Sequence, residues 1–206
     1  MKINYQLQLD NIINNIQKEQ ITPTLLLHSC CAPCSSYVLE YLSDYFRISV
    51  LYFNPNIYPA SEYYYRENEQ REFIEKLETK NKIDFIRAEY DPKLYFEAIK
   101  GYEMDREGGH RCHLCYELRF REAAKVAAEN NFDYFTTTLS ISPHKDSQIL
   151  NQLGEKIAEE YGVNYLFSDF KKKNGFKRSV ELTNKYNMYR QDYCGCVFSY
   201  NESKNR

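Results

Sequence analysis

The chain lacks a long apolar segment, an excess of either charge, and tryptophan. No stretch approaches the roughly 20 apolar residues that a transmembrane helix needs. Polar side chains interrupt residues 1–20, where a secretory signal would be apolar. We therefore expect a cytoplasmic protein without a membrane partner. The 27 basic residues nearly balance the 29 acidic ones, so any contact with nucleic acid must be local rather than driven by an overall field.

Cysteine, by contrast, is plentiful. In a chain expected inside the cell, seven cysteines indicate metal or redox chemistry rather than a disulfide framework. The odd count agrees with this interpretation. They fall into three groups: Cys30, Cys31 and Cys34; Cys112 and Cys115; and Cys194 and Cys196.

The first group follows a short apolar run that predicts a buried strand over 24–28, and helical apolar spacing returns over about 35–45. The cysteines would then occupy a loop that leads into a helix. Free backbone N–H groups there favour anions, so we expect lowered thiol pKa values. Adjacent Cys30 and Cys31 are hard to explain by core packing, because neighbouring side chains on a strand point to opposite faces. A shared metal centre explains them better, as does a redox pair of Cys31 and Cys34.

Strand and helix patterns alternate along the rest of the chain. This alternation predicts an α/β fold with a doubly wound, mostly parallel sheet and helices on both faces. Ligands of such sheets bind beyond the carboxyl ends of the strands, so the cysteine loop and the loop over 140–146 should face one crevice. We expect helices over 4–19, 61–80, 93–100, 112–130 and 147–161, strands over 48–53, 85–90, 134–139 and 164–167, and a mobile connection over 101–111.

The length favours one domain over 1–206. Its expected parts are an N-terminal helix within 1–22 and a C-terminal helical segment over 170–206 that carries the last two cysteines.

The second group, Cys112 and Cys115, is spaced so that both side chains share one helix face. Alone, this pair is a weak indication of a site. Together with Cys30 and Cys31 it could form a four-thiolate site, as zinc or an iron–sulfur cluster requires. An adjacent cysteine pair is awkward for zinc, so iron–sulfur is favoured, with zinc and metal-free thiol chemistry left open.

The third group, Cys194 and Cys196, would close only a small, strained disulfide ring, which cycles easily. The favoured interpretation is a dithiol that stores electrons reversibly. The alternatives are that the two cysteines are further metal ligands, or simply small residues in a tight turn. His144 and Asp146 follow a strand, where each could give a proton or bind a metal, or simply hold the turn. His28 could hydrogen-bond to the first cysteines, or merely pack.

Basic residues cluster at 171–173, Lys177 and Arg178. Either this is a solvated loop, or it contacts a nucleic-acid backbone. A second, weaker aromatic patch with the same interpretation consists of Tyr58, Tyr63, Tyr64, Tyr65 and Arg66.

Five motifs span almost the whole chain: HSCCAPC at 28–34, NPNIYP at 54–59, RCHLCY at 111–116, TTLSISPHK at 137–145 and YRQDYCGC at 189–196. In combination they resemble the QueH-type epoxyqueuosine reductases. The resemblance implies an oxidoreductase that reduces epoxyqueuosine to queuosine at the wobble position of tRNA, the last step of queuosine biosynthesis. Its partners would be tRNA carrying epoxyqueuosine and an electron donor that the sequence does not identify.

The resemblance also implies a fold similar to nucleotide-binding α/β/α domains. It further implies a redox-active pair, Cys194 and Cys196, and a [4Fe-4S] cluster held by Cys30, Cys31, Cys112 and Cys115. A second iron is associated with the family, and Cys34 is the candidate for its extra ligand. Iron-assisted removal of the epoxide oxygen would take protons from an acid such as Asp146 or His144.

Two other classes compete with this interpretation. A thioredoxin-like thiol–disulfide oxidoreductase would use Cys31 and Cys34 at the start of a helix, but it leaves Cys30, Cys112 and Cys115 without a role. An ATP-using tRNA-modifying enzyme, or a non-catalytic tRNA-binding module of similar fold, should offer glycines to phosphate after the first strand. The chain has cysteines there and no glycine, which disfavours nucleotide binding.

Overall fold

The apolar run before the first cysteines forms the central strand of a parallel sheet in the computed structural model, which describes residues 2–205. The sheet has the order β3-β2-β1-β4-β5. Its strands are β1 (Thr24–His28), β2 (Arg47–Tyr52), β3 (Ile83–Arg87), β4 (Tyr134–Thr137) and β5 (Asn164–Tyr165). All pairs are parallel, which confirms the predicted doubly wound α/β fold. The order reverses between β1 and β4, and ligands of such sheets bind at that point.

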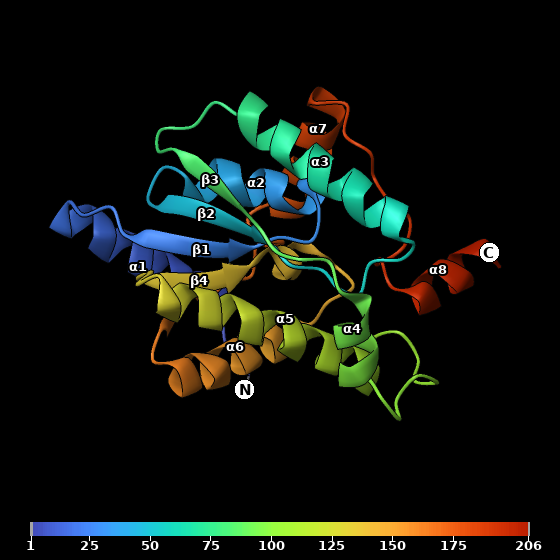
Figure 1. Cartoon of the computed structure of the whole chain (residues 1–206). Helices are drawn as coiled ribbons and strands as arrows, with labels where there is room; N and C mark the ends of the chain where they lie inside the picture. Colours follow the sequence, from blue (N-terminus) through green and yellow to red (C-terminus); the bar gives the residue numbers. More distant parts are fainter. Residues whose placement is uncertain (1, 206) are drawn as a thin grey trace.

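Helices cover both faces of the sheet (Figure 1). They are α1 (Tyr5–Glu19), α2 (Ala32–Leu42), α3 (Ala60–Lys76), α4 (Pro92–Ala98), α5 (His110–Glu129), α6 (Ser147–Tyr161), α7 (Gly175–Lys185) and α8 (Val197–Lys204), with a 3-10 helix η1 (Thr138–Ile141). Leu25 and Leu27 of β1 pack with α1, α2 and α3 on one face. Leu26 packs with Phe135, α5 and α6 on the other. This two-residue period buries all three leucines completely.

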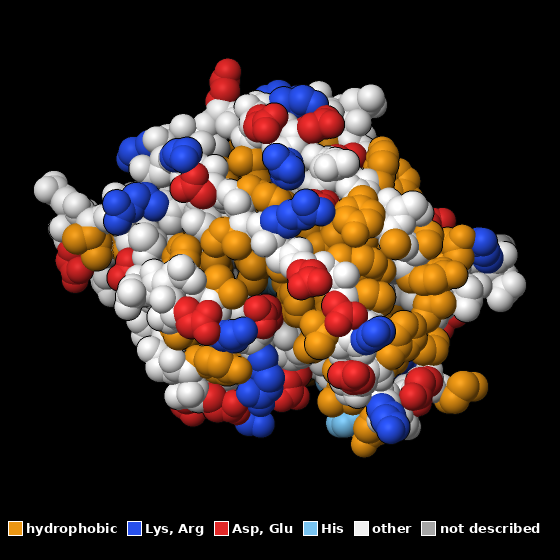
Figure 2. All heavy atoms as spheres, viewed as in Figure 1, with side chains coloured by type: hydrophobic (Ala, Val, Ile, Leu, Met, Phe, Trp, Pro, Cys, Tyr) orange, Lys and Arg blue, Asp and Glu red, His pale blue; other side chains and the backbone are white. Residues whose placement is uncertain are grey.

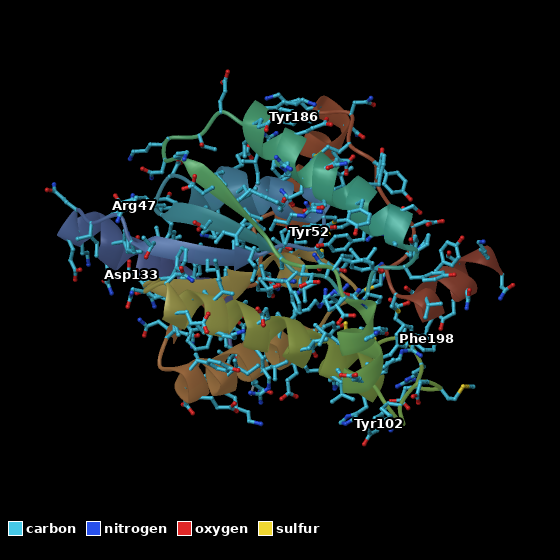
Figure 3. The ribbon with its side chains drawn as sticks, viewed as in Figure 1. Arg47, Tyr52, Tyr102, Asp133, Tyr186 and Phe198 are labelled. Atoms are coloured by element: carbon cyan, nitrogen blue, oxygen red, sulfur yellow. The ribbon has the colours of Figure 1, made fainter. Side chains whose placement is uncertain are left out.

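The C-terminal segment reaches the carboxyl side of the sheet. After α7, which packs on α2, the chain continues to α8 beside α4 (Figure 1). The guanidinium of Arg111 on α5 lies 4.2 Å from the ring centroid of Phe198 on α8. Figure 3 shows Phe198 and Tyr102 on this side and Asp133 on the opposite, amino-terminal side of the sheet. The chain between α7 and α8 is therefore placed near the strand ends where a ligand would bind.

Several element ends differ from the predicted ones. Helix α2 begins at Ala32 rather than near 35, because Cys31 is its N-cap and Pro33 suits a first helical turn. The strand expected over 134–139 ends at Thr137, where the chain tightens into η1. The strand expected over 85–90 is Ile83–Arg87, since its neighbour β2 ends opposite Arg87. The first difference puts Cys34 on a helix instead of in a loop.

Charges of both signs are interspersed on the face in Figure 2, and apolar side chains gather toward α4 and α8. This agrees with the near-neutral charge of the chain. Within residues 2–205, no helix has the length and apolarity required to cross a membrane.

Gly175 marks a close approach between α7 and its neighbours. A Cβ at this position would overlap the carbonyl oxygen of Phe170 and the ring of Tyr37 on α2. We expect Gly175→Ala to lower the free energy of unfolding by about 1–3 kcal/mol, as overpacking does, measured by urea denaturation. Asn184→Ala, at an exposed position of the same helix, should change it by less than about 0.5 kcal/mol. Equal losses in both variants would contradict close packing at Gly175.

Candidate thiol and metal site

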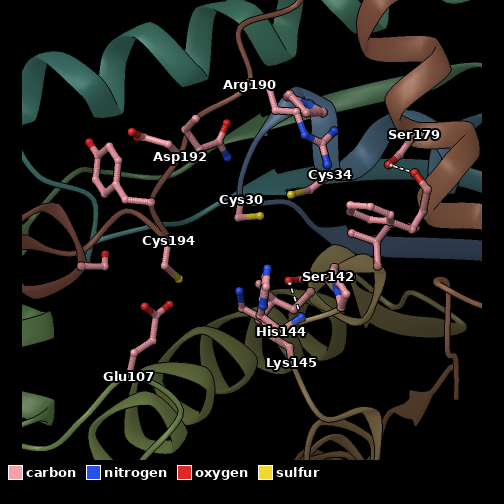
Figure 4. Close-up of a pocket in the computed structure, with 18 of the residues that line it drawn as sticks. Cys30, Cys34, Glu107, Ser142, His144, Lys145, Ser179, Arg190, Asp192 and Cys194 are labelled. Atoms are coloured by element: carbon pink, nitrogen blue, oxygen red, sulfur yellow. Dashed lines mark hydrogen bonds between the residues drawn. The ribbon is translucent and has the colours of Figure 1, made fainter. Parts of the chain in front are cut away.

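The carboxyl ends of β1 and β4 open into a cavity of about 650 Å³. It is lined by residues that follow β1, residues that follow β4, and the chain that precedes α8. Figure 4 shows Cys30, Cys34 and Cys194 around one open space, with His144 and Lys145 facing them. This confirms that the cysteine loop and the loop over 140–146 face one crevice. The volume is within the range of ligand-binding pockets.

The sulfurs of Cys30, Cys31 and Cys34 form one cluster and lie within 4.8 Å of one another. Strand β1 brings Cys30 and Cys31 to the sheet edge, where their sulfurs are 3.8 Å apart. Cys34 joins them from the first turn of α2. Among residues 2–205, this is the one group of three or more cysteine, histidine or carboxylate side chains close enough to hold a metal ion. Three soft sulfur donors at this spacing could bind one.

Negative charge is divided unevenly among these thiols. Hydrogen bonds from Cys31 and Cys34, helped by the positive charges of Lys145 and Arg119, hold the pKa of Cys30 well below its usual value. Burial raises the pKa of Cys31 to about 12, and hydrogen bonding to Cys30 and Cys31 raises the pKa of Cys34. The expectation of lowered values is therefore wrong for Cys31 and Cys34, because burial and the Cys30 thiolate outweigh the helix N-terminus.

Helix α5 carries Cys112 and Cys115 near its start, as the spacing predicted. The sulfur of Cys112 accepts a hydrogen bond from the Gly108 N–H at 3.2 Å, and Cys115 packs in a small buried cluster with Cys196. Neither belongs to the close three-sulfur cluster. The four-ligand set of Cys30, Cys31, Cys112 and Cys115 therefore stays a prediction.

Residues 194–196 form a fixed turn, the CGC turn. Tyr58 N–H donates to the Gly195 carbonyl at 2.8 Å, and the Tyr193 hydroxyl donates to the Tyr58 carbonyl at 2.8 Å. Gly195 has φ +130°, a conformation that favours glycine. Cys194 lines the cavity, whereas Cys196 is buried as the N-cap of α8, and both are free thiols. The second and fifth sequence motifs thus meet at the site.

Arg119 is a buried cation near Cys115 on α5 and Cys30 after β1. It is 2% exposed, and its Nε donates to the Cys115 carbonyl at 3.1 Å. Its Nη2 has no hydrogen-bond partner, and no acidic side chain of the described residues pairs with it. Although burial lowers its pKa, the charges of Cys115, Cys194 and Cys30 raise it overall. Since a buried charge is costly without a counter-charge, Arg119 would favour negative charge on these sulfurs.

Of the histidine and aspartate residues predicted at the site, only His144 lines the cavity, whereas His28 and Asp146 do not. The ring of His28 is fully buried, with Nε2 donating to the Phe53 carbonyl at 3.1 Å and Nδ1 accepting from Thr137 at 3.0 Å. It therefore supports the fold and does not hydrogen-bond to the cysteines. His144 lines the cavity, but Asp146 caps α6 by accepting from the Gln148 N–H at 2.8 Å and is not in the lining. This position favours the capping role for Asp146.

Two surface predictions change. In the basic cluster, Lys173 pairs with Asp10 at 2.6 Å, Arg178 pairs with Glu40 at 2.6 Å, and Lys171 pairs with an aspartate. These ion pairs weaken the case for backbone contacts there. The aromatic patch is wrong for Tyr63 and Arg66, which are buried under their neighbours, although Tyr58, Tyr64 and Tyr65 are exposed.

Sequence reasoning assigned no role to five charged residues of the cavity wall: Glu107, Arg119, Lys145, Arg190 and Asp192. Arg119 lies one helical turn after Cys115, and Asp192 two residues before Cys194, so their spacing offered a signal. Nothing in the sequence distinguishes Glu107, which reaches the cavity only because the chain before α5 folds back to it.

Comparisons with known proteins agree on one family. The family model described as "Epoxyqueuosine reductase QueH" matches residues 25–202. The chain is 44% identical over 202 residues to the Epoxyqueuosine reductase QueH of Staphylococcus aureus (strain Mu50), covering 96% of this chain and 84% of that protein. It is 43% identical over 200 residues to that of Streptococcus pyogenes serotype M1, covering 96% and 78%. The protein of that name from Thermotoga maritima is 32% identical over 186 residues, covering 89% and 93%.

Proposed function

We propose that this chain, which belongs to the epoxyqueuosine reductase QueH family, reduces epoxyqueuosine to queuosine in tRNA. The observation that carries the proposal is the convergence of Cys30, Cys31 and Cys34 at the point where the strand order reverses. A cavity of about 650 Å³ opens there, which is large enough to admit a modified base.

Iron is the cofactor that these residues fit best. Soft sulfur donors suit an iron–sulfur centre, and the unpaired Arg119 guanidinium beside them would balance its negative charge. We propose that Cys30, Cys31, Cys112 and Cys115 hold a [4Fe-4S] cluster, with Cys34 as a ligand of a second iron. When bound, such a cluster would supply electrons one at a time.

The reaction needs two electrons and two protons. Breaking both C–O bonds of the epoxide leaves an alkene, and the oxygen departs as water. Oxidation of the Cys194 and Cys196 thiols to a disulfide releases two electrons and two protons, which balances the conversion. An electron donor must then reduce the disulfide before the next turnover. Cys194 lies in the cavity wall, where its thiol can approach a bound substrate.

Other residues of the wall would act on charge and protons. Lys145 and Arg119 place positive charge where the epoxide oxygen would become negative, which favours C–O cleavage. His144 lines the cavity from the loop after β4 and can hold a proton for the departing oxygen. Asp192 and Glu107 are further acids in the wall.

The proposed function is tested with anaerobically reconstituted protein, a chemical reductant and tRNA that carries epoxyqueuosine. Nucleoside analysis by mass spectrometry should show queuosine appearing as epoxyqueuosine disappears. Conversion by iron-free protein, or none by fully loaded protein, would overturn the proposal. The thioredoxin-like alternative predicts insulin reduction instead, which the buried Cys31, with its raised pKa, disfavours.

We expect the paired substitution Cys194→Ser and Cys196→Ser to lower turnover by about 100-fold or more, since it removes the two-electron store while sparing the three-sulfur cluster. Iron content should stay at the wild-type level, and both quantities are measured on the same sample. Native turnover in this variant would refute the dithiol role. Loss of iron would instead show that the pair contains ligands.

A further inference from the structure

Arg66 is a second buried arginine at the site. It lies on α3 with 0% exposure, and its Nε donates to Glu62 at 2.7 Å. Its Nη1 and Nη2 have no hydrogen-bond partner among the described residues. Unsatisfied donors on a buried cation are costly, so a group that balances them is expected next to these two nitrogens.

The CGC turn is next to Arg66, and the charge of Cys31 acts on its guanidinium. Burial lowers the pKa of Arg66, but the charge of Cys31, followed by the bond to Glu62, raises it overall. A Cβ on Gly195 would lie 3.4 Å from Arg66 Nη1, and the guanidinium carbon lies 5.0 Å from the ring centroid of Tyr193. The guanidinium therefore lies against the CGC turn, and its charge interacts with Cys31.

Gln191 provides a direct contact to the same sulfur. Its Nε2 donates to Cys31 Sγ at 2.9 Å, and its Oε1 has no partner among residues 2–205. The side chain also lines the cavity and lies three residues before Cys194. Arg66 and Gln191 come from segments far apart in sequence. Gln191 donates a hydrogen bond to the fully buried Cys31, and Arg66 adds a buried positive charge that interacts with the same residue.

We propose that Arg66 and Gln191 are positioning residues that stabilise the Cys31 sulfur as an anionic iron ligand and raise the reduction potential of the centre it holds. Positive charge and hydrogen bonds to sulfur stabilise the reduced form of such a centre, because that form carries one more negative charge. The inference rests on the proposed iron centre and adds that its potential is set partly from α3 and partly from the chain before the CGC turn.

The test compares anaerobically reconstituted wild-type protein with Arg66→Met, Arg66→Lys and Gln191→Leu. The midpoint potential is measured by a reductive titration followed by electron paramagnetic resonance, with iron content determined on each sample. We expect Arg66→Met and Gln191→Leu to shift the potential to more negative values, and Arg66→Lys, which keeps the charge, to shift it less. Glu62→Gln is the matched control, since it removes the ion-pair partner and keeps the Arg66 charge, and it should give no negative shift.

Wild-type potentials in both Arg66→Met and Gln191→Leu would overturn the inference. The inference would also be overturned if iron-free Arg66→Met had a lower melting temperature while the iron-loaded variant kept the wild-type potential. That combination would show that Arg66 has only a structural role. Should Arg66→Met fail to fold, Gln191→Leu decides alone, since its side chain is on the irregular chain before α8. Wild-type protein that binds no iron would refute the centre itself, whereas unshifted potentials in loaded variants would refute only this inference.

Discussion

Cys31→Ala should lower turnover by about 100-fold or more and reduce the bound iron after anaerobic reconstitution, because removing a ligand costs at least as much as removing its supporting contacts. Cys31 is a fully buried member of the three-sulfur cluster, and the N-cap position of α2 fixes its backbone there. Iron is measured by colorimetric assay, and turnover by the tRNA nucleoside assay.

Ser43→Ala is the matched control for this variant. Ser43 is buried at the opposite end of α2, so its replacement tests whether any buried change in this helix disturbs iron binding. We expect wild-type iron and turnover for Ser43→Ala. Full iron content in Cys31→Ala would show that the proposed ligand set is wrong, whatever its effect on turnover.

Arg119→Met should lower turnover by about 100-fold, the usual consequence of removing a preorganised group that stabilises developing charge. Arg119→Lys should lose less, because it keeps the charge but not the bond geometry of the guanidinium. The iron-free Arg119→Met protein should be at least as stable as wild type, since replacing an unpaired buried charge by an apolar side chain of similar size is often neutral or stabilising.

For Arg119→Met we expect lower turnover but no loss of stability. A role in the reaction can therefore be distinguished from a role in packing. Turnover is measured by the nucleoside assay and stability by the melting temperature of iron-free protein. A large drop in melting temperature with proportional loss of iron would show that Arg119 supports the fold. Unchanged turnover would contradict its proposed role beside the substrate oxygen.

Local patterns were sufficient for much of the fold. The apolar run at 24–28 and the alternation after it predicted a central strand and a parallel α/β sheet, because burial on both faces demands apolar side chains at successive positions. They also predicted that the loop after β1 and the loop after β4 share a crevice, since parallel strands end at one edge. Element ends were less predictable, because they depend on where a neighbouring strand stops, as Arg87 shows beside β2.

The candidate site divides in the same way. Its cysteine types, their spacing and the five motifs could be recognised in the sequence, since ligand chemistry resides in residue type. The burial of Arg66 and Arg119 and the pairing of His28 could not, because each depends on which distant segment packs against it. The capping role of Asp146 was among the roles that the sequence offered, because the cap is a local contact with Gln148.

From the order of its residues alone, the chain specifies its strands, its thiol groups and the family they indicate, because these follow from local periodicity and spacing. Folding determines which sulfurs meet and which cations are buried beside them. Cys31 illustrates the difference: a helix N-terminus predicts a lowered thiol pKa, but complete burial beside the Cys30 thiolate raises it to about 12. Long-range packing removes water from that sulfur, and the loss of hydration outweighs the local effect of the helix.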